Sequence, residues 1–202
     1  MDDKQSKRLF DLLFYKLDGE GTSLFALLDG SRDPRVLKAI VESGLDRECL
    51  LSGDLVPALQ AAAPYIVRLR HGSLACEKLI GEMWGKSWGM FVAAQVGLRM
   101  VHRHLRTFLR VQTEDRRKLL FRYYDPRVLR VFLPSCDPGQ LWQIFGPIQR
   151  FDMETPDSNQ LLRFRIVPEP GRSLVLRSWT YPLSGLENAA DDHGLSLPKR
   201  AL

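Results

Sequence analysis

Cysteine is scarce in this sequence. The three that occur, Cys49, Cys76 and Cys136, are odd in number and widely spaced, and no CxxC motif or Cys/His ligand spacing accompanies them. This usage argues against a disulfide framework and against the usual structural zinc sites. We therefore expect a reduced, cytoplasmic protein without a structural metal.

Long apolar runs are absent too. No stretch approaches the roughly 18 apolar residues that a membrane helix needs. Near the N-terminus Asp11 and Lys16 interrupt the apolar residues, and no small-residue cleavage site of a secretory signal follows. We expect no membrane partner, and a hydrophobic share of 45% with 26% charged residues is typical of a globular protein.

Catalytic and cofactor motifs are also missing. The stretch GKSWG, Gly85 to Gly89, fits G-x-S-x-G, but a helical pattern precedes it and a strand-like run follows. This order is the reverse of the one that presents a nucleophile such as Ser87 in hydrolases. A phosphate-binding loop fails because Ile80 stands where its first glycine should be. Without a dinucleotide fingerprint or a carboxylate pair at acid–base spacing, we expect neither a cofactor nor an enzyme.

What the sequence does have is concentrated positive charge. Ten basic and three acidic residues lie between Arg99 and Arg130, a local balance of +7 in a chain whose total is +5. The segment from Gly97 to Leu109 has helical periodicity, with apolar residues on one side. The basic face opposite them consists of Arg99, Arg103, Arg106 and Arg110. This face is either a solvated exterior or a surface that meets an anionic partner.

Apolar runs of strand length alternate with helix-length segments through the first two thirds of the chain. The runs SLFALLD, PYIVRL and GMFVAA are nearly continuous in apolar residues, as expected of strands covered on both faces. We predict an α/β fold with a mixed, largely parallel sheet and flanking helices.

The pattern changes after Arg110. FLRVQ and KLLFRYY flank the polar turn TEDRR and predict a hairpin or adjacent strands. Three later segments alternate apolar and polar residues and predict an antiparallel β meander at the C-terminal end: IQRFDMET, NQLLRFRIVP and RSLVLRSWTYP. We expect an α/β domain over residues 1–148, a meander lobe over 149–185 and a flexible tail over 186–202.

The pentapeptide DPRVL occurs twice, after Arg32 and after Tyr124. Aspartate is a good N-cap, and proline suits the first position of a helix. Asp33 and Asp125, and Asp137 in a similar Asp-Pro pair, are therefore predicted helix starts. Capping does not explain Arg35 and Arg127, because a cation in the first turn opposes the helix dipole. Each needs a nearby carboxylate or a partner.

LFALLDG, PYIVRL and above all HLRTFLRVQTEDRRKLLFRYYDPRVLRVFLP, followed by FGPI, resemble the bacterial DUF4123 family, the type VI secretion effector chaperones or adaptors. The resemblance runs from about Leu24 to Ile148. The family pattern falls on Asp29, Arg122, Tyr123, Asp125, Pro126 and Arg127, to which we add Arg130 as a candidate contact. One departure is that Glu114, Asp115 and Arg116 offer no glycine in the turn before the signature.

The resemblance implies a non-enzymatic cytoplasmic protein that binds a toxic effector and helps to load it onto the VgrG spike, with the meander as an effector-specific lobe. The signature arginines either touch these partners or form internal ion pairs with Asp29 or Asp125. Two other functions stay open. One is a nucleic-acid-binding module, with Phe121, Tyr123 and Tyr124 beside the basic region. The other is an enzyme of unrecognised type that uses Asp29, Asp125 and His102.

Overall fold

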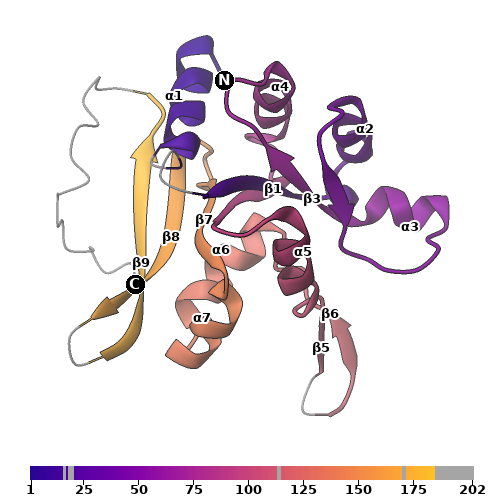
Figure 1. Ribbon diagram of the computed structural model, residues 1–202, viewed down its shortest axis with the longest axis vertical. Coiled ribbons are helices and arrows are strands. Elements are labelled where there is room, and N and C mark those ends of the chain that lie inside the picture. The colour runs from indigo at the N-terminus through magenta and orange to yellow at the C-terminus, as the bar shows by residue number, and fades with distance from the viewer. Residues whose placement is uncertain (16, 18–20, 113–114, 170–171, 185–202) are drawn as a thin grey trace.

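A seven-stranded sheet runs through the molecule (Figure 1). The computed structural model describes residues 1–15, 17, 21–112, 115–169 and 172–184. The strands are β1 Ser23–Asp29, β2 Arg47–Cys49, β3 Pro64–Leu69, β4 Gly89–Ala94, β7 Ile148–Glu154, β8 Gln160–Glu169 and β9 Arg172–Pro182. Their order across the sheet is β2-β3-β1-β4-β7-β8-β9, which places β1 near the centre of the N-terminal part.

Every neighbouring pair in this sheet is antiparallel, so the prediction of a largely parallel sheet is wrong. Strand β1 lies between β3 and β4, and both run opposite to it. The continuous apolar runs correctly indicated strands buried on both faces. Burial on two faces comes from helical cover, however, and an apolar run carries no information about strand direction.

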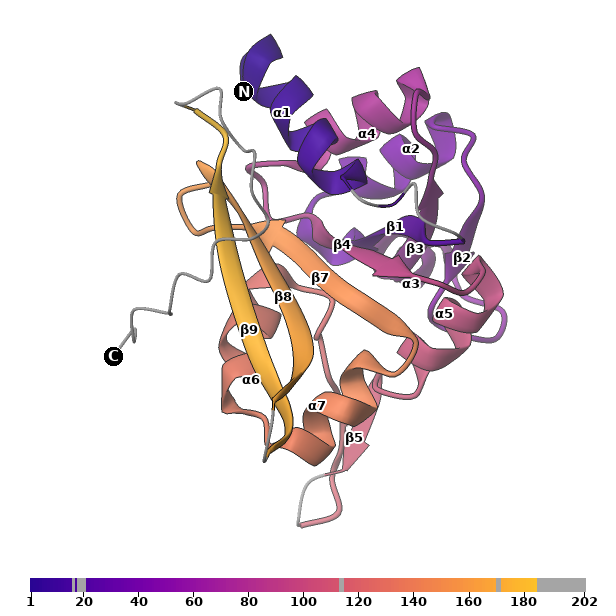
Figure 2. The ribbon, with the colours of Figure 1, turned by 60° about the vertical axis from the view of Figure 1, so that its left-hand side comes forward.

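Helices cover both faces of the sheet. One layer holds α1 Asp3–Phe14, α2 Arg35–Glu42 and α4 Leu74–Met83, and the other holds α5 Leu98–Arg106, α6 Pro126–Ser135 and α7 Pro138–Phe145. In β1 the residues Leu24, Ala26 and Leu28 pack toward the first layer, whereas Phe25 and Leu27 pack toward the second. Figure 2 shows α6 and α7 on the side of β7–β9 opposite α1. A short helix α3 Pro57–Ala62 and a 3-10 turn Gly30–Arg32 complete the N-terminal half.

The predicted hairpin and meander are both present. Strands β5 Arg110–Gln112 and β6 Lys118–Leu120 pair as a separate two-stranded sheet. The antiparallel meander β7–β9 continues the large sheet, because β7 pairs with β4. Its proposed role as an effector-specific lobe stays a prediction, and the predicted flexible tail, 186–202, lies outside the described residues. Within the described part of the chain, no helix has both the length and the apolar character to cross a bilayer.

Helix α1 was not predicted from the sequence. Two buried arginines of the meander bind its last turn. Arg163 Nη2 donates to the carbonyl oxygen of Leu12 at 2.8 Å, and Arg150 Nη2 donates to that of Leu13. Both carbonyls belong to the last turn of α1, where backbone acceptors have no partner within the helix. Asp152 supplies the counter-charge, with ion-pair distances of 2.7 Å to Arg163 Nε and 3.0 Å to Arg150 Nε.

Replacing Asp152 by asparagine should destabilise the fold and release α1. The change leaves two buried guanidiniums without a counter-charge, which costs about 3–5 kcal/mol in comparable cases. Chemical denaturation would measure the lost free energy of unfolding, and amide hydrogen exchange should be faster in α1. Asp46→Asn is the matched control, because Asp46 pairs with Arg70 at 2.8 Å in solvent and should cost less than about 1 kcal/mol. Equal stability of the two variants would contradict this role of Asp152.

Candidate functional site

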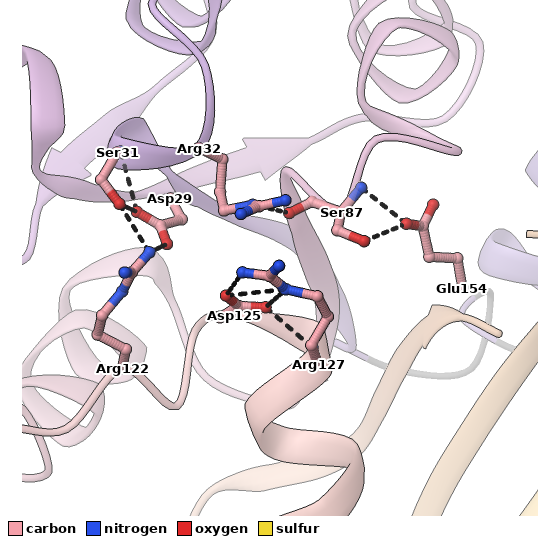
Figure 3. A network of polar contacts seen from close by, with 8 residues as sticks. All are labelled: Asp29, Ser31, Arg32, Ser87, Arg122, Asp125, Arg127 and Glu154. Carbon is pink, nitrogen blue, oxygen red and sulfur yellow. Dashed lines mark hydrogen bonds and ion pairs between the residues drawn. The ribbon is translucent and has the colours of Figure 1, made fainter. Parts of the chain in front are cut away.

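Four segments that are distant in the sequence meet at one corner of the sheet (Figure 3). The C-terminal end of β1 brings Asp29, the loop before β4 brings Ser87, the first turn of α6 brings Arg127, and the end of β7 brings Glu154. The sequence resemblance pointed to two of these segments. The structure adds the other two and joins them through hydrogen bonds.

Asp29 is fully buried and is bonded on both oxygens. Its Oδ1 accepts from the backbone N–H of Ser31 at 3.0 Å and from Ser31 Oγ at 2.7 Å. Its Oδ2 accepts from Arg122 Nη2, which also donates to Ser31 Oγ. The Arg122 side chain is nevertheless 42% exposed. Asp29 thus holds one edge of a guanidinium that still faces solvent.

Asp125 makes the same arrangement at the start of α6. Its Oδ1 caps the helix by accepting from the backbone N–H of Arg127 at 3.0 Å, and the predicted N-cap is confirmed. Nε and Nη2 of Arg127 also bond to the carboxylate, with Nη2 2.6 Å from Oδ2. Burial alone would raise the pKa of Asp125, but the hydrogen bonds from Arg127 outweigh it and lower the pKa. The Arg127 side chain stays 49% exposed, while that of Asp125 is 3% exposed.

The sequence left two alternatives for the signature arginines, contact with a partner or internal ion pairs. The structure shows that the internal ion pairs are formed. Arg122 pairs with Asp29, and Arg127 pairs with Asp125. The alternatives do not exclude each other, because in each pair the carboxylate is buried and the guanidinium is about half exposed. A guanidinium has five N–H donors, so one that is held by one edge can still donate to another molecule.

The loop with the sequence GKS, Gly85 to Ser87, binds a carboxylate, and this carboxylate is the side chain of Glu154 in the same chain. Glu154 accepts from the backbone N–H of Ser87 at 2.7 Å, from Ser87 Oγ at 2.9 Å, and from the N–H of Gly85. Gly85 and Ser87 both have positive φ, at 77° and 49°, which turns their N–H groups toward the carboxylate. Arg32 Nε donates to the carbonyl oxygen of Ser87 at 3.2 Å. The hydroxyl of Ser87 is engaged by a carboxylate that fixes the loop.

Arg32 and Glu154 were missed by reasoning from the sequence. Glu154 ends an ordinary-looking alternating strand, and no local pattern shows that its partner is a loop 67 residues earlier. The positive φ of Ser87 could not be predicted either, because serine, unlike glycine, does not favour this backbone conformation. Only the GKS match marked this loop as unusual.

The remaining signature residues, Tyr123 and Pro126, are buried, and the added candidate Arg130 cross-links the corner. Tyr123 is buried and donates through its hydroxyl to the carbonyl oxygen of Leu105 at 2.7 Å, and burial raises its pKa. Pro126 is the buried first residue of α6. Arg130 Nη1 donates to the carbonyl oxygen of Glu154 at 2.6 Å, and burial lowers its pKa. Burial also raises the pKa of Tyr124 to about 12.

The predicted basic helix face lies at the surface. Arg99, Arg103 and Arg106 are exposed on α5, whereas Arg110 is the first residue of β5 and does not belong to the helix. His102 contacts β2 through a backbone group, with its Nε2 2.8 Å from the carbonyl oxygen of Cys49, and this hydrogen bond does not join it to Asp29 or Asp125. Among the residues that the structure describes, no group of three or more His, Cys, Asp or Glu could hold a metal ion.

Asp125→Asn isolates the charge of the second pair, because asparagine caps a helix about as well as aspartate. At pH 7 the variant should lose about 1.5–3 kcal/mol of unfolding free energy, the contribution of hydrogen bonds to a charged group. The folded-state pKa of Asp125 is lowered, so its stabilisation is fully present above the unfolded pKa of about 4 and is lost progressively as the pH falls from there through the lowered folded-state pKa.

The difference between wild type and variant should therefore shrink in acid, as measured by denaturant titration at several pH values. Asp137→Asn is the matched control, because Asp137 caps α7 through the N–H of Gln140 at the exposed surface. A difference that is constant with pH, or equally large at Asp137, would contradict the ion pair as its source.

Comparison with known proteins matches residues 24–143 to the model of a family described as a domain of unknown function, DUF4123. The match covers β1 to most of α7 and includes Asp29, Arg122, Asp125 and Arg127, while Glu154 lies beyond it. No curated protein and no solved structure matches the chain. Because the matched residues span well over half of the sequence, the chain belongs to the DUF4123 family.

Proposed function

We propose that this protein is a non-enzymatic cytoplasmic chaperone or adaptor that binds a type VI secretion effector and loads it onto the VgrG spike. The proposal follows from the resemblance of the signature segments to the type VI secretion adaptors, and the match to the DUF4123 model supports the family part of it. In this proposal the corner around Arg122 and Arg127 is a contact surface for a partner protein, and the meander β7–β9 helps to select the effector.

One observation carries the proposal: each signature arginine is fixed by a buried carboxylate and still faces solvent. A fixed guanidinium loses little side-chain entropy when it binds, and arginine is enriched among the residues that dominate protein interfaces. Another exposed cation, Arg35, lies at the start of α2, where it pairs with Asp33 at 2.6 Å and lies 5.7 Å from the ring centroid of Trp88, next to Ser87. The corner is suited to partner groups that accept hydrogen bonds, carboxylates above all.

Arg127→Lys tests the proposal without leaving Asp125 unpaired. Lysine keeps the positive charge but not the planar fork that lets one edge bind Asp125 while the other faces outward. The variant should melt close to the wild type and retain about tenfold less effector or VgrG in a quantitative pull-down, since one desolvated interfacial contact of this kind accounts for such a factor.

Arg70→Lys serves as the control, because Arg70 also forms an exposed pair with an aspartate, Asp46 at 2.8 Å, on a different part of the surface. It should bind like the wild type. Binding by Arg127→Lys at the wild-type level would show that the exposed guanidinium is not a contact, and a loss of folding would assign Arg127 to stability alone.

A further inference from the structure

The hairpin β5–β6 exposes aliphatic side chains that nothing else in the described part of the chain covers. Leu119 and Leu120 are 48% and 52% exposed, and Val111 is also exposed. Val111 lies directly opposite Leu119, so these two share one face, and Leu120 points to the other. In Figure 1 the hairpin extends away from the large sheet, below α5. A two-stranded ribbon this short gains stability from a third strand or a packing partner.

The outer edge of β6 is suited to a third strand. The N–H of Phe121 donates to the carbonyl oxygen of Leu109 at 2.9 Å, so this pair is a hydrogen-bonded one. Antiparallel ladders alternate, and the next hydrogen-bonded pair is therefore Val111 with Leu119. The backbone groups of Lys118 and Leu120 then point outward from β6. Among the described strands, none pairs with this edge.

The positive charge around the edge of β6 indicates the charge of the segment that would bind there. Residues 110–120 carry four basic and two acidic side chains, and the exposed arginines of α5 lead directly into the hairpin. A partner segment with acidic side chains would be attracted to this surface, and apolar side chains at alternate positions would cover Leu119. The end of the hairpin leads to the corner already described, because Phe121 and then Arg122 follow β6 directly.

A nucleic acid fits this surface less well. The aromatic residues beside the basic region are turned inward: Tyr123 and Tyr124 are buried, and Phe121 packs edge-on against Phe132 with ring centroids 4.7 Å apart. Stacking platforms for bases need exposed rings. The side chains that are exposed on the hairpin are aliphatic.

We infer that the outer edge of β6 binds an extended segment of a partner protein, acidic and apolar at alternate positions, as a third strand. This inference rests on the proposed function, to which it adds the kind of segment that is recognised. Main-chain hydrogen bonds from Lys118 and Leu120 would hold the segment, and its apolar side chains would pack on Leu119.

The probe is a labelled peptide of alternating Glu and Val, followed by fluorescence anisotropy with the full chain. It should bind, whereas the same composition interrupted by prolines and a Lys/Val analogue should not. Leu119→Ser should weaken binding about tenfold, the effect of exposing one leucine contact. Val131→Ser is the control, because Val131 is 75% exposed on α6 and should change nothing.

Equal binding of the proline peptide would overturn strand addition, as would unchanged binding by Leu119→Ser at an unchanged melting temperature. Tighter binding of a DNA duplex than of the Glu/Val peptide would overturn the choice of partner. Failure of the hairpin inference can be distinguished from failure of the proposed function. If effector or VgrG is retained by both wild type and Leu119→Ser, only the hairpin inference fails. If the peptide behaves as expected but neither protein is retained, only the adaptor function fails.

Discussion

Two buried carboxylates, Asp29 and Asp125, organise the corner where β1 and α6 meet. Asp29 and Asp125 have almost no exposure, and burying a charge is costly unless it is paired and hydrogen-bonded. Arg122 and Arg127, which are partly exposed, meet both requirements by pairing with the two carboxylates. The same ion pairs therefore fix the positions of two guanidiniums at the surface. The guanidiniums are held at one edge by their own chain, and their side chains remain about half exposed to solvent.

The family match ends within α7, yet the fold does not divide there. β7 continues the sheet by pairing with β4, and Glu154 at its end fixes the loop of Gly85 and Ser87 inside the matched region. Arg150 and Arg163 hold the last turn of α1, which precedes the matched region. Segments from both ends of the chain therefore support each other and the family core. A change in the meander can reach the corner through Glu154, and under the proposed function this would link the effector-selecting lobe to the shared contact surface.

Local chemistry in the sequence predicted local structure well. The Asp-Pro pairs marked the starts of α6 and α7, and at α2 Asp33 accepts the N–H of Arg35 although the helix begins after Pro34. Alternation identified the meander, and the polar turn identified the hairpin, in which Arg116 takes the positive φ of 63° that a glycine would have supplied. The prediction of parallel strands was wrong because an apolar run indicates that a strand is buried on both faces but does not indicate its direction. Glu154 and Arg32 were missed because their partners are set by tertiary contact.

Amide hydrogen exchange of the protein, alone and mixed with a candidate effector or with VgrG, would test whether the corner and the hairpin are contact surfaces. Binding should slow exchange in residues 118–130, which include the outer edge of β6 and the first turn of α6, and should change it little around Arg70 and Asp46. Protection confined to other faces of the molecule, with residues 118–130 exchanging as in the free protein, would contradict their role as contact surfaces.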